Sequence, residues 1–470
     1  MKELSVGETI RAVGGRLLRG EEADTYRGVS SDSRTVFPRD LFVALAGARF
    51  DAHDFLSQAV ARGCRSLMVS RFDAAPADFD GNVIGVADTL IAYQDLAAYY
   101  RALIAPRTIG VTGSVGKTSL KDMIASVCET RRRTVRSEKN FNNHIGVPRT
   151  ILAMDADTEV LVLEMGMNHA GEIRRLVEIG RPDIAVISNV GLSHRENFDD
   201  EDGVFEAKAE IATFFDEHSV LVVNGDDPRL GRFADMPGRN YRLVTAGEDA
   251  TCDFRVSDAK YINETEIAFE MIHGEHTRRF VLPAAGLYNA VNAGLAAAVV
   301  HELGIGMDRV AETLRVARRA PHRLQLLERA GIKVIDDVYN AGPASMRSAL
   351  EYLAVVRGAR KIAVLAGMNE LGGDSPLLHR AVGAFAVKSG ADLLITVGGK
   401  AEDIAVGAAD AGMPTERRAH FADNASASDF LAGQTRPGDV YLVKGSRAMR
   451  MEEVVDALKS LRAPGGRGTT

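Results

Sequence analysis

The ten residues GVTGSVGKTS, from Gly110 to Ser119, have the composition of a phosphate-binding loop but not its usual spacing. The usual form is G-x-x-x-x-G-K-[ST], and counting back from Gly116 places Val111 where the first glycine should stand. A β-rich run precedes the glycines, and a pattern typical of a helix follows them. Backbone N–H groups and the helix N-terminus would then face an anion. The order of strand, loop and helix therefore predicts a nucleotide site with a shortened loop.

Two side chains at the end of this loop have roles that their chemistry suggests. Lys117 would reach the outer phosphates, and the hydroxyl of Thr118 would bind Mg²⁺. A chance Gly-Lys-Thr at a helix start is the alternative, and the order of the elements argues against it. The residues expected to surround the nucleotide are Thr112, Gly113, Ser114, Val115, Gly116, Lys117, Thr118 and Ser119.

An acidic residue and a histidine follow two further apolar runs of the kind expected for buried strands. Glu164 ends VLVLE, and His194 comes shortly after AVISNV. Ligands gather at the carboxyl ends of strands in an open parallel sheet, so both residues would face the loop that holds Thr118. Taken alone, Glu164 is equally well explained as a surface residue, and His194 is better explained as a loop residue. Together with Thr118 they predict an oxygen-rich Mg²⁺ site.

Three further groups of polar residues have two interpretations each. Lys208, in GVFEAKAEI, is by itself an ordinary helix-surface lysine. Asn289 and Asn292 share one helix face, where their amides either read an adenine edge or form a cap and a polar stripe. Asn142 and Asn143, in FNNHIG, serve either turn formation or substrate binding.

Apolar runs and helical spacing divide the chain into three α/β segments that must position these residues. The first, residues 1–86, mixes short apolar runs such as LFVAL with turn residues. The second, residues 87–319, alternates strand and helix patterns, which predicts a mainly parallel sheet with helices on both faces. Within it, residues 259–286 predict an antiparallel appendage. The third, residues 320–470, restarts the alternation and predicts a dinucleotide-fold-like (Rossmann-like) domain.

Bulk composition excludes several classes of protein. The formal net charge is −7 and there is no large basic block, which argues against nucleic acid as a partner. Cys64, Cys128 and Cys252 are far apart, which disfavours a disulfide framework or a thiolate metal site and fits a reducing cytoplasm. No run approaches the roughly 20 apolar residues that span a bilayer. We expect a cytoplasmic monomer that is not inserted in a membrane.

Nine strings spread along the chain resemble one family of enzymes. They are TGSVGKTS, FNNHIGVPRT, LEMGMNHAGEI, ISNVGLSH, AKAEI, LYNAVNAGLAAA, IDDVYNAGPASM, GMNELG and VKGSRAMRMEE. Together they are similar to the Mur ligases, the ATP-dependent amide ligases of bacterial cell-wall precursor synthesis. The phosphate loop of that family has the short form found here, so Gly113 and Gly116 carry it.

The resemblance implies three domains and a set of catalytic residues. The domains would be an N-terminal UDP-sugar-binding domain, a central ATP-binding domain and a C-terminal Rossmann-like ligase domain. Lys117 would bind the phosphates of ATP, while Thr118 and Glu164 would bind one Mg²⁺. His194 and Lys208 would hold a second Mg²⁺, with Lys208 converted by CO₂ to a carbamate.

The same resemblance implies contacts with ATP and with the peptide substrate. Asn289 and Asn292 would contact adenine, and Asn142 and Asn143 match positions near the muramoyl substrate. The residues expected to approach ATP from the third domain are Arg323, Asp337, Tyr339 and Asn340. The residues at the family's uridine site are Ser31, Asp32, Ser33 and Arg34.

Within the family, DDVYNAGPASM and GMNELG resemble the branch that joins D-Ala-D-Ala to UDP-MurNAc-tripeptide. A sister ligase that adds another amino acid is the nearest alternative, but its Asp-Asn-Pro-Arg motif does not occur here. A catalytically inactive scaffold is a second alternative, and the retention of all the expected catalytic residues speaks against it. A dinucleotide oxidoreductase is disfavoured because no G-x-G-x-x-G follows the first strand of the third segment.

Overall fold

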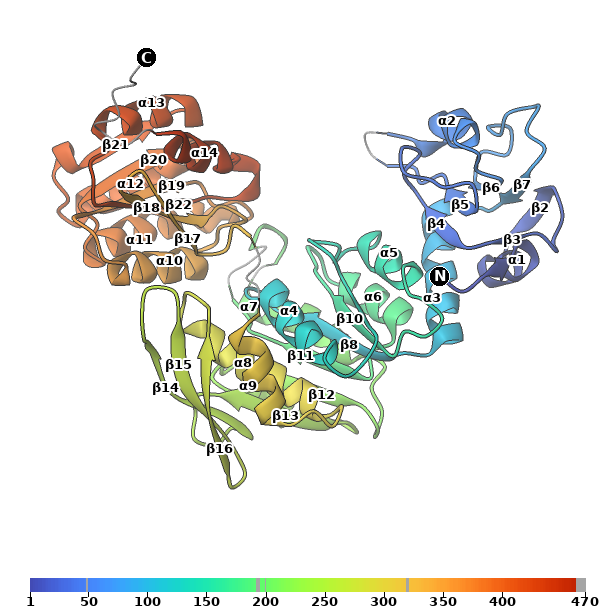
Figure 1. The fold of residues 1–470 in the computed structure, drawn as a ribbon, viewed down its shortest axis with the longest axis horizontal. Helices are drawn as coiled ribbons and strands as arrows, with labels where there is room; N and C mark the ends of the chain where they lie inside the picture. The colour runs from blue at the N-terminus through green and yellow to red at the C-terminus, as the bar shows by residue number, and fades with distance from the viewer. Residues whose placement is uncertain (48–49, 192–194, 199, 318–320, 462–470) are drawn as a thin grey trace, which may run out of the picture.

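A computed structural model describes residues 1–47, 50–191, 195–198, 200–317 and 321–461 of the chain. Figure 1 shows three α/β parts, with the first part and the last part on opposite sides of the central one. Each part is built around its own sheet, as the alternation of apolar runs predicts. No helix among the described residues is long and apolar enough to cross a membrane.

The first part has a five-stranded sheet in the order β2-β7-β6-β5-β4. Strands β4 to β7 pair in parallel, so their carboxyl ends share one edge. A capping box between Ser5 and Glu8 begins α1. The elements are β1 (Leu4–Ser5), α1 (Val6–Val13), β2 (Arg16–Arg19), β3 (Thr25–Tyr26), β4 (Gly28–Ser30), β5 (Asp40–Val43), η1 (Ala52–Phe55), α2 (Leu56–Ala61), β6 (Ser66–Val69) and β7 (Asn82–Gly85). Helix α3 (Thr89–Ile104) then leads into the central part.

The central part has a nine-stranded sheet in the order β16-β15-β14-β13-β12-β11-β8-β10-β9. The strands are β8 (Arg107–Thr112), β9 (Thr134–Arg136), β10 (Val160–Glu164), β11 (Ile184–Ile187), β12 (Val220–Asn224), β13 (Arg242–Gly247), β14 (Phe254–Tyr261), β15 (Ile267–His273) and β16 (His276–Leu282). Strands β8 to β13 are parallel, and β14, β15 and β16 form the antiparallel appendage that the sequence predicts.

Helices cover both faces of the central sheet, so alternate residues of a strand pack into two different apolar clusters. Leu161 and Leu163 belong to one apolar cluster, whereas Val160 and Val162 belong to the other. The helices are α4 (Lys117–Cys128), α5 (Gly146–Leu152), α6 (Glu172–Gly180), α7 (Glu201–Ala209), α8 (Tyr288–His301) and α9 (Met307–Arg315). Short 3₁₀ turns also occur, among them η2 (Arg195–Asn197) and η3 (Glu210–Ala212).

The C-terminal part has a six-stranded sheet in the order β17-β18-β22-β19-β20-β21, parallel except for β17. The strands are β17 (Gln325–Arg329), β18 (Ile332–Asp337), β19 (Arg360–Ala366), β20 (Leu393–Val397), β21 (Arg418–Phe421) and β22 (Asp439–Lys444). The helices are α10 (Pro343–Val355), α11 (Ser375–Lys388), α12 (Glu402–Asp410), α13 (Asn424–Gln434) and α14 (Glu452–Ser460). This arrangement is the doubly covered parallel sheet expected from the sequence.

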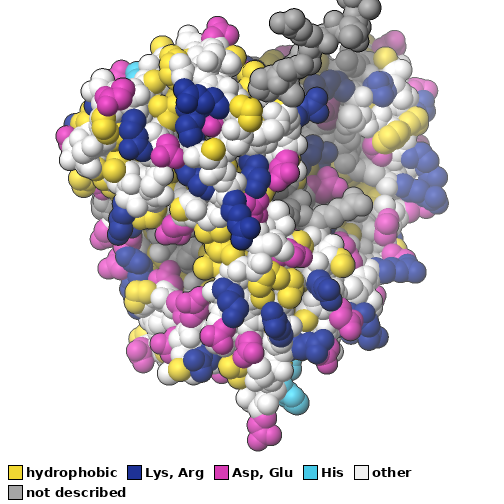
Figure 2. All heavy atoms as spheres, turned by 60° about the vertical axis from the view of Figure 1, so that its left-hand side comes forward, with side chains coloured by type: hydrophobic (Ala, Val, Ile, Leu, Met, Phe, Trp, Pro, Cys, Tyr) yellow, Lys and Arg dark blue, Asp and Glu magenta, His cyan; other side chains and the backbone are white. Residues whose placement is uncertain are grey.

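The turn between β14 and β15 joins the central part to the C-terminal part. Glu264 in this turn accepts hydrogen bonds from Lys333 Nζ at 2.6 Å and from the backbone N–H of Arg357 at 2.7 Å. The hydroxyl of Tyr352 donates to the backbone carbonyl of Glu264 at 2.6 Å. Figure 1 shows the tip of this hairpin beside α10. On the face drawn in Figure 2, basic and acidic side chains are interspersed over the C-terminal part and the hairpin.

Candidate active site

The phosphate loop connects β8 to α4, at the carboxyl edge of the central sheet. Lys117 is the first residue of α4, and its Nζ donates to the carbonyl of Gly113 at 2.6 Å and to that of Ser114 at 3.3 Å. Burial lowers the pKa of Lys117, and the positive charge of Arg323 acts in the same direction, against the charges of Glu164 and Glu370. The ammonium therefore lies in the loop, in the position from which it can turn toward a bound phosphate.

Two residues after β11, which the sequence analysis did not identify, hold the phosphate loop in shape. The side chain of Asn189 accepts from the N–H of Val115 and donates to the carbonyl of Val115, both at 2.9 Å. The hydroxyl of Ser188 donates to the same carbonyl at 2.7 Å. The string ISNV contained the signal, because short polar residues directly after a buried strand lie at the ligand-binding edge of the sheet.

Gly113 gives the first mutational prediction. Its φ of +145° is rare for L side chains, and a Cβ atom would lie 2.0 Å from the hydroxyl of Ser188. We expect Gly113→Ala to displace Ser188 from Val115 and to weaken ADP binding by about 5- to 150-fold, since such strain costs about 1–3 kcal/mol. Calorimetric titration of ADP measures the effect.

Gly238→Ala is the matched control for this variant. Gly238 also has a positive φ, +73°, but no atom lies within 4 Å of its Cβ position. Gly238→Ala therefore also places a side chain at a positive φ, but its Cβ meets no neighbouring atom. We expect its affinity for ADP to equal that of the unmodified protein. Equal ADP affinity in the Gly113→Ala variant and the unmodified protein would contradict the role given to this loop.

Glu164 ends β10 and its carboxylate is buried, with 2% of the residue exposed. Asn142 Nδ2 donates to Glu164 Oε1 at 3.0 Å. Among the residues that the structure describes, no hydrogen-bond partner exists for Glu164 Oε2. A buried carboxylate oxygen without a partner is costly unless a cation or water satisfies it, so this atom fits a metal ligand.

Of the other three proposed metal ligands, the structure describes Lys208 and Thr118, and both are buried. Lys208 lies on α7 and is 1% exposed; burial, and next the positive charge of Lys117, hold its pKa well below the usual range. Thr118 is buried on α4. His194 lies outside the described residues.

No cluster of three or more His, Cys, Asp or Glu side chains that could hold a metal occurs in the described ranges. One protein carboxylate is nevertheless compatible with Mg²⁺. This ion retains several water molecules and binds substrate phosphates alongside one or two carboxylates.

Arg323 links the C-terminal part to the phosphate loop. Its Nη2 donates to Thr118 Oγ1 at 3.0 Å, and its guanidinium lies 4.1 Å above the ring of Tyr339. His322 and Leu324 on either side of it have φ values of +60° and +46°, which are unusual for residues other than glycine. Two such residues on either side of one arginine are typical of a functional position that the surrounding fold holds in place.

The other residues expected near ATP from this part have mainly internal partners. Asp337 Oδ2 accepts from Lys444 Nζ at 2.6 Å, and Lys444 also donates to the carbonyl of Asn340 at 2.9 Å. Burial raises the pKa of Asp337, although Lys444 opposes this effect. Burial likewise raises the pKa of Tyr339. The Asp337–Lys444 pair therefore supports the loop after β18, which carries Tyr339 and Asn340.

The two amides of α8 are buried beside the phosphate loop. Asn289 Nδ2 donates to the carbonyl of Ala285 at 2.7 Å, and Asn292 Nδ2 donates to Asn289 Oδ1 at 3.4 Å. A Cβ atom on Gly116 would lie 3.3 Å from the amide of Asn292. The structure thus brings Asn292 against the loop, while the Nδ2 of Asn289 is used within its own helix turn.

The residues expected to bind uridine follow β4 in the first part, and those expected to bind the muramoyl group lie between β9 and α5 in the central part. Arg34 donates to both carboxylate oxygens of Asp32, at 2.9 and 2.8 Å, which lowers the pKa of Asp32 to about 2. Ser31 lies between β4 and these residues, and the Ser33 hydroxyl donates to Gln58 at 2.6 Å. Asn143 accepts from the N–H of Gly146 at 2.9 Å, as a turn residue does before a helix.

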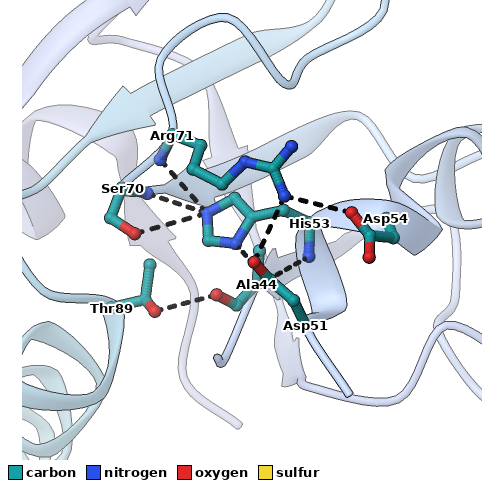
Figure 3. A network of polar contacts seen from close by, with 7 residues as sticks. All are labelled: Ala44, Asp51, His53, Asp54, Ser70, Arg71 and Thr89. Atoms are coloured by element: carbon teal, nitrogen blue, oxygen red, sulfur yellow. Dashed lines mark hydrogen bonds and ion pairs between the residues drawn. The ribbon is translucent and has the colours of Figure 1, made fainter. Parts of the chain in front are cut away.

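A buried histidine ties together the loops at the carboxyl edge of the first sheet (Figure 3). His53 has 1% of its side chain exposed, and its Nδ1 lies 2.6 Å from Asp51 Oδ1. Its Nε2 accepts from the backbone N–H groups of Ser70 at 3.0 Å and Arg71 at 3.3 Å. Since Nε2 accepts, Nδ1 carries the proton and donates to Asp51. Arg71 also binds Asp51 and Asp54.

We expect His53→Ala to lower the free energy of unfolding of the first part by about 2–3 kcal/mol, because two backbone N–H groups lose their acceptor. Differential scanning calorimetry measures the change as a lower midpoint of thermal unfolding. His218→Ala is the control, since the side chain of His218 is 84% exposed. Equal transitions in the two variants would contradict the prediction.

Three domain models of one family match consecutive stretches of the chain. They are the Mur ligase family catalytic domain over residues 25–108, the Mur ligase middle domain over residues 111–300, and the Mur ligase glutamate ligase domain over residues 322–447. The second match contains the phosphate loop and Glu164, and the third contains Arg323.

Similar proteins share most of this length. The chain is 36% identical to the UDP-N-acetylmuramoyl-tripeptide–D-alanyl-D-alanine ligase of Bacillus subtilis, over 93% of this chain and 94% of that protein. It is 35% identical to the ligase of the same name from Escherichia coli, with the same coverage. A crystal structure of MurF from Acinetobacter baumannii matches with a TM-score of 0.89 and 29% identity, covering 98% of this chain and 99% of that one. MurF from Thermotoga maritima in complex with ADP matches with a TM-score of 0.81 and 28% identity, covering 92% and 97%.

Proposed function

The chain belongs to the Mur ligase family, and we propose that it joins D-alanyl-D-alanine to UDP-N-acetylmuramoyl-tripeptide with conversion of ATP to ADP and phosphate. The product is UDP-N-acetylmuramoyl-pentapeptide, a precursor of peptidoglycan. Two curated ligases of this name match nearly the whole chain, which supports this choice of substrates over those of a sister ligase. The structural observation that carries the proposal is the bond from Arg323 to Thr118, because it places the C-terminal part on the phosphate loop.

We propose that the reaction proceeds in two steps. The terminal carboxylate of the tripeptide attacks the γ-phosphorus of ATP, and ADP leaves, giving an acyl phosphate. The amine of D-alanyl-D-alanine then attacks the acyl carbon, the tetrahedral intermediate expels phosphate, and the amine proton is released. Positioning and charge neutralisation account for most of the catalysis of phosphoryl transfer.

The side chains of this chain supply those two effects. Lys117 neutralises the charge of the transferred phosphoryl group, and Arg323, which donates to Thr118 beside it, orients the phosphates. Mg²⁺ would add further positive charge at the phosphates: one ion would be held by Thr118 and Glu164, and a second by His194 and Lys208, the last as a carbamate. The orphaned oxygen of Glu164 supports this assignment.

The proposal includes the location and the oligomeric state. The three cysteines are free, and Cys64 and Cys128 are buried, which agrees with a reducing cytoplasm. We propose that the chain acts there as a monomer. Light scattering on the purified protein tests this, because a mass near 50.6 kDa is then expected.

Phosphate release tests the chemistry and the substrates together. The assay contains ATP, Mg²⁺ and UDP-N-acetylmuramoyl-tripeptide, and the amine is D-alanyl-D-alanine, diaminopimelate or L-lysine. Release with D-alanyl-D-alanine alone supports the proposal. Release with another amine on its matching precursor would make the protein a sister ligase, and no release with any amine would favour an inactive scaffold.

A further inference from the structure

Lys121 is a buried ammonium for which the proposed reaction has no use. It lies on α4, one helical turn after Lys117, and 2% of its side chain is exposed. Burial of an ammonium is unfavourable unless its hydrogen bonds are made, so a residue that served packing alone would be apolar. The buried ammonium of Lys121 on α4, the helix that follows the phosphate loop, therefore indicates a role for its hydrogen bonds.

The ammonium of Lys121 binds the segment that follows β9. Its Nζ donates to the backbone carbonyl of Ser137 at 2.6 Å and lies 3.0 Å from Asp122 Oδ1. Ser137 is fully buried, and its N–H donates to the carbonyl of Val162 on β10 at 2.9 Å. Lys121 thereby connects α4 to the edge of the sheet that carries the proposed metal ligand.

The hydroxyl of Ser137 completes the connection. It accepts a hydrogen bond from the backbone N–H of Glu164 at 3.1 Å. Glu164 is thus held at its backbone through Ser137, and at Oε1 by Asn142, while Oε2 has no partner among the described residues. These hydrogen bonds connect Lys121 on α4 through Ser137 to Glu164, whose Oε2 is the atom without a partner.

We propose that Lys121 is a positioning residue, which acts through Ser137 to fix Glu164 relative to the Thr118 hydroxyl on the same helix as Lys121. This inference rests on the proposed function, since it assumes that Glu164 and Thr118 bind the divalent cation. Mutation of a partner that orients a metal ligand typically lowers metal affinity by about 10- to 100-fold. Lys121 would then set the affinity for the cation without touching it.

Metal binding measured without turnover tests this role. Mn²⁺ is added to the full-length protein with ADP, and the free ion is measured by electron paramagnetic resonance. Lys121→Met keeps an unbranched apolar side chain, one heavy atom shorter, and removes the donor and the charge. We expect its Mn²⁺ affinity to fall about tenfold, with the affinity for ADP in the absence of metal unchanged.

A second variant and a control separate positioning from general damage. Ser137→Ala removes the acceptor for the Glu164 N–H, and its Mn²⁺ affinity should fall similarly, with less than additive loss in the double variant. Asp122→Asn leaves the bond from Lys121 to Ser137 in place, and its affinity should stay within about twofold of the unmodified protein.

The outcomes are distinct from those of the ligation assay. If Lys121→Met does not fold, Lys121→Gln takes its place, while Ser137→Ala tests the bond from the Ser137 hydroxyl to Glu164. Unchanged Mn²⁺ affinity in the folded variants would overturn the inference, even if the protein ligates D-alanyl-D-alanine. Loss of Mn²⁺ affinity in both, with ADP binding retained, would support it whichever amine the enzyme uses.

Discussion

Lys117→Ala is expected to lower kcat for ATP-dependent ligation by about 10³-fold, the scale on which preorganised cationic groups stabilise a phosphoryl transition state. The structure gives the reason, because the Lys117 ammonium is held in the loop by the carbonyls of Gly113 and Ser114. It can reach the γ-phosphate by exchanging these contacts for phosphate oxygens. Steady-state phosphate release at saturating substrate concentrations measures the loss.

Lys260→Ala provides the comparison for that variant. Lys260 lies on β14 of the same domain, is exposed, and is not part of the proposed site. Lys260→Ala changes the net charge by the same amount as Lys117→Ala. Because Lys260 is exposed and outside the proposed site, kcat should stay within about twofold of that of the unmodified protein. A Lys117→Ala protein with at least half of the original rate would refute the role of the loop in phosphoryl transfer.

Lys208→Ala should reduce kcat by roughly 10²- to 10³-fold, because it removes a proposed source of negative charge beside the cation. A neutral amine is the form that reacts with CO₂, and the pKa of Lys208 is held well below its usual range by burial and then by Lys117. The lowered pKa of Lys208 favours its free amine, the form that the proposed carbamate requires. Phosphate release measures the rate, and ¹³C-bicarbonate labelling followed by NMR detects the carbamate directly.

A small carboxylate is expected to restore part of the lost activity. Truncation of a lysine that is 1% exposed leaves a cavity, and formate or acetate can place an anion in it. Lys208→Arg should not respond to these ions, since its side chain fills the site with a permanent cation. Full activity in Lys208→Ala without any added carboxylate would contradict the assignment.

Much of the fold follows from the sequence because inner strands such as β8, β10 and β11 are largely buried apolar runs separated by helices. The runs RTIGVT, EVLVLEM and DIAVISNV correspond to β8, β10 and β11, and the alternating segment after residue 259 includes part of the antiparallel appendage. The missed strands β9 and β17 lie at sheet edges. Edge strands are short and flanked by charged residues, so their patterns resemble loops. The inner strand β13 was missed because RLVTAG has neither an unbroken apolar run nor strict alternation.

The site was less predictable, because its geometry depends on contacts between segments far apart in the chain. The phosphate loop has a local pattern, and Glu164 was found from its position at a strand end. The position of Ser188 and Asn189 directly after a buried strand places them at the ligand-binding edge, but no residue pattern indicates that they hydrogen-bond to Val115 of the loop. For Asn142, sequence reasoning left turn formation or substrate binding open, whereas the structure shows a bond to Glu164.

The bond between Arg323 and Thr118 joins residues 205 positions apart, and this separation has a consequence during synthesis. A ribosome that adds about 5–20 residues per second produces the phosphate loop roughly 10–40 s before it produces Arg323. During this interval the phosphate loop has been translated but Arg323 has not. The order of the chain therefore postpones assembly of the complete catalytic centre until most of translation is finished.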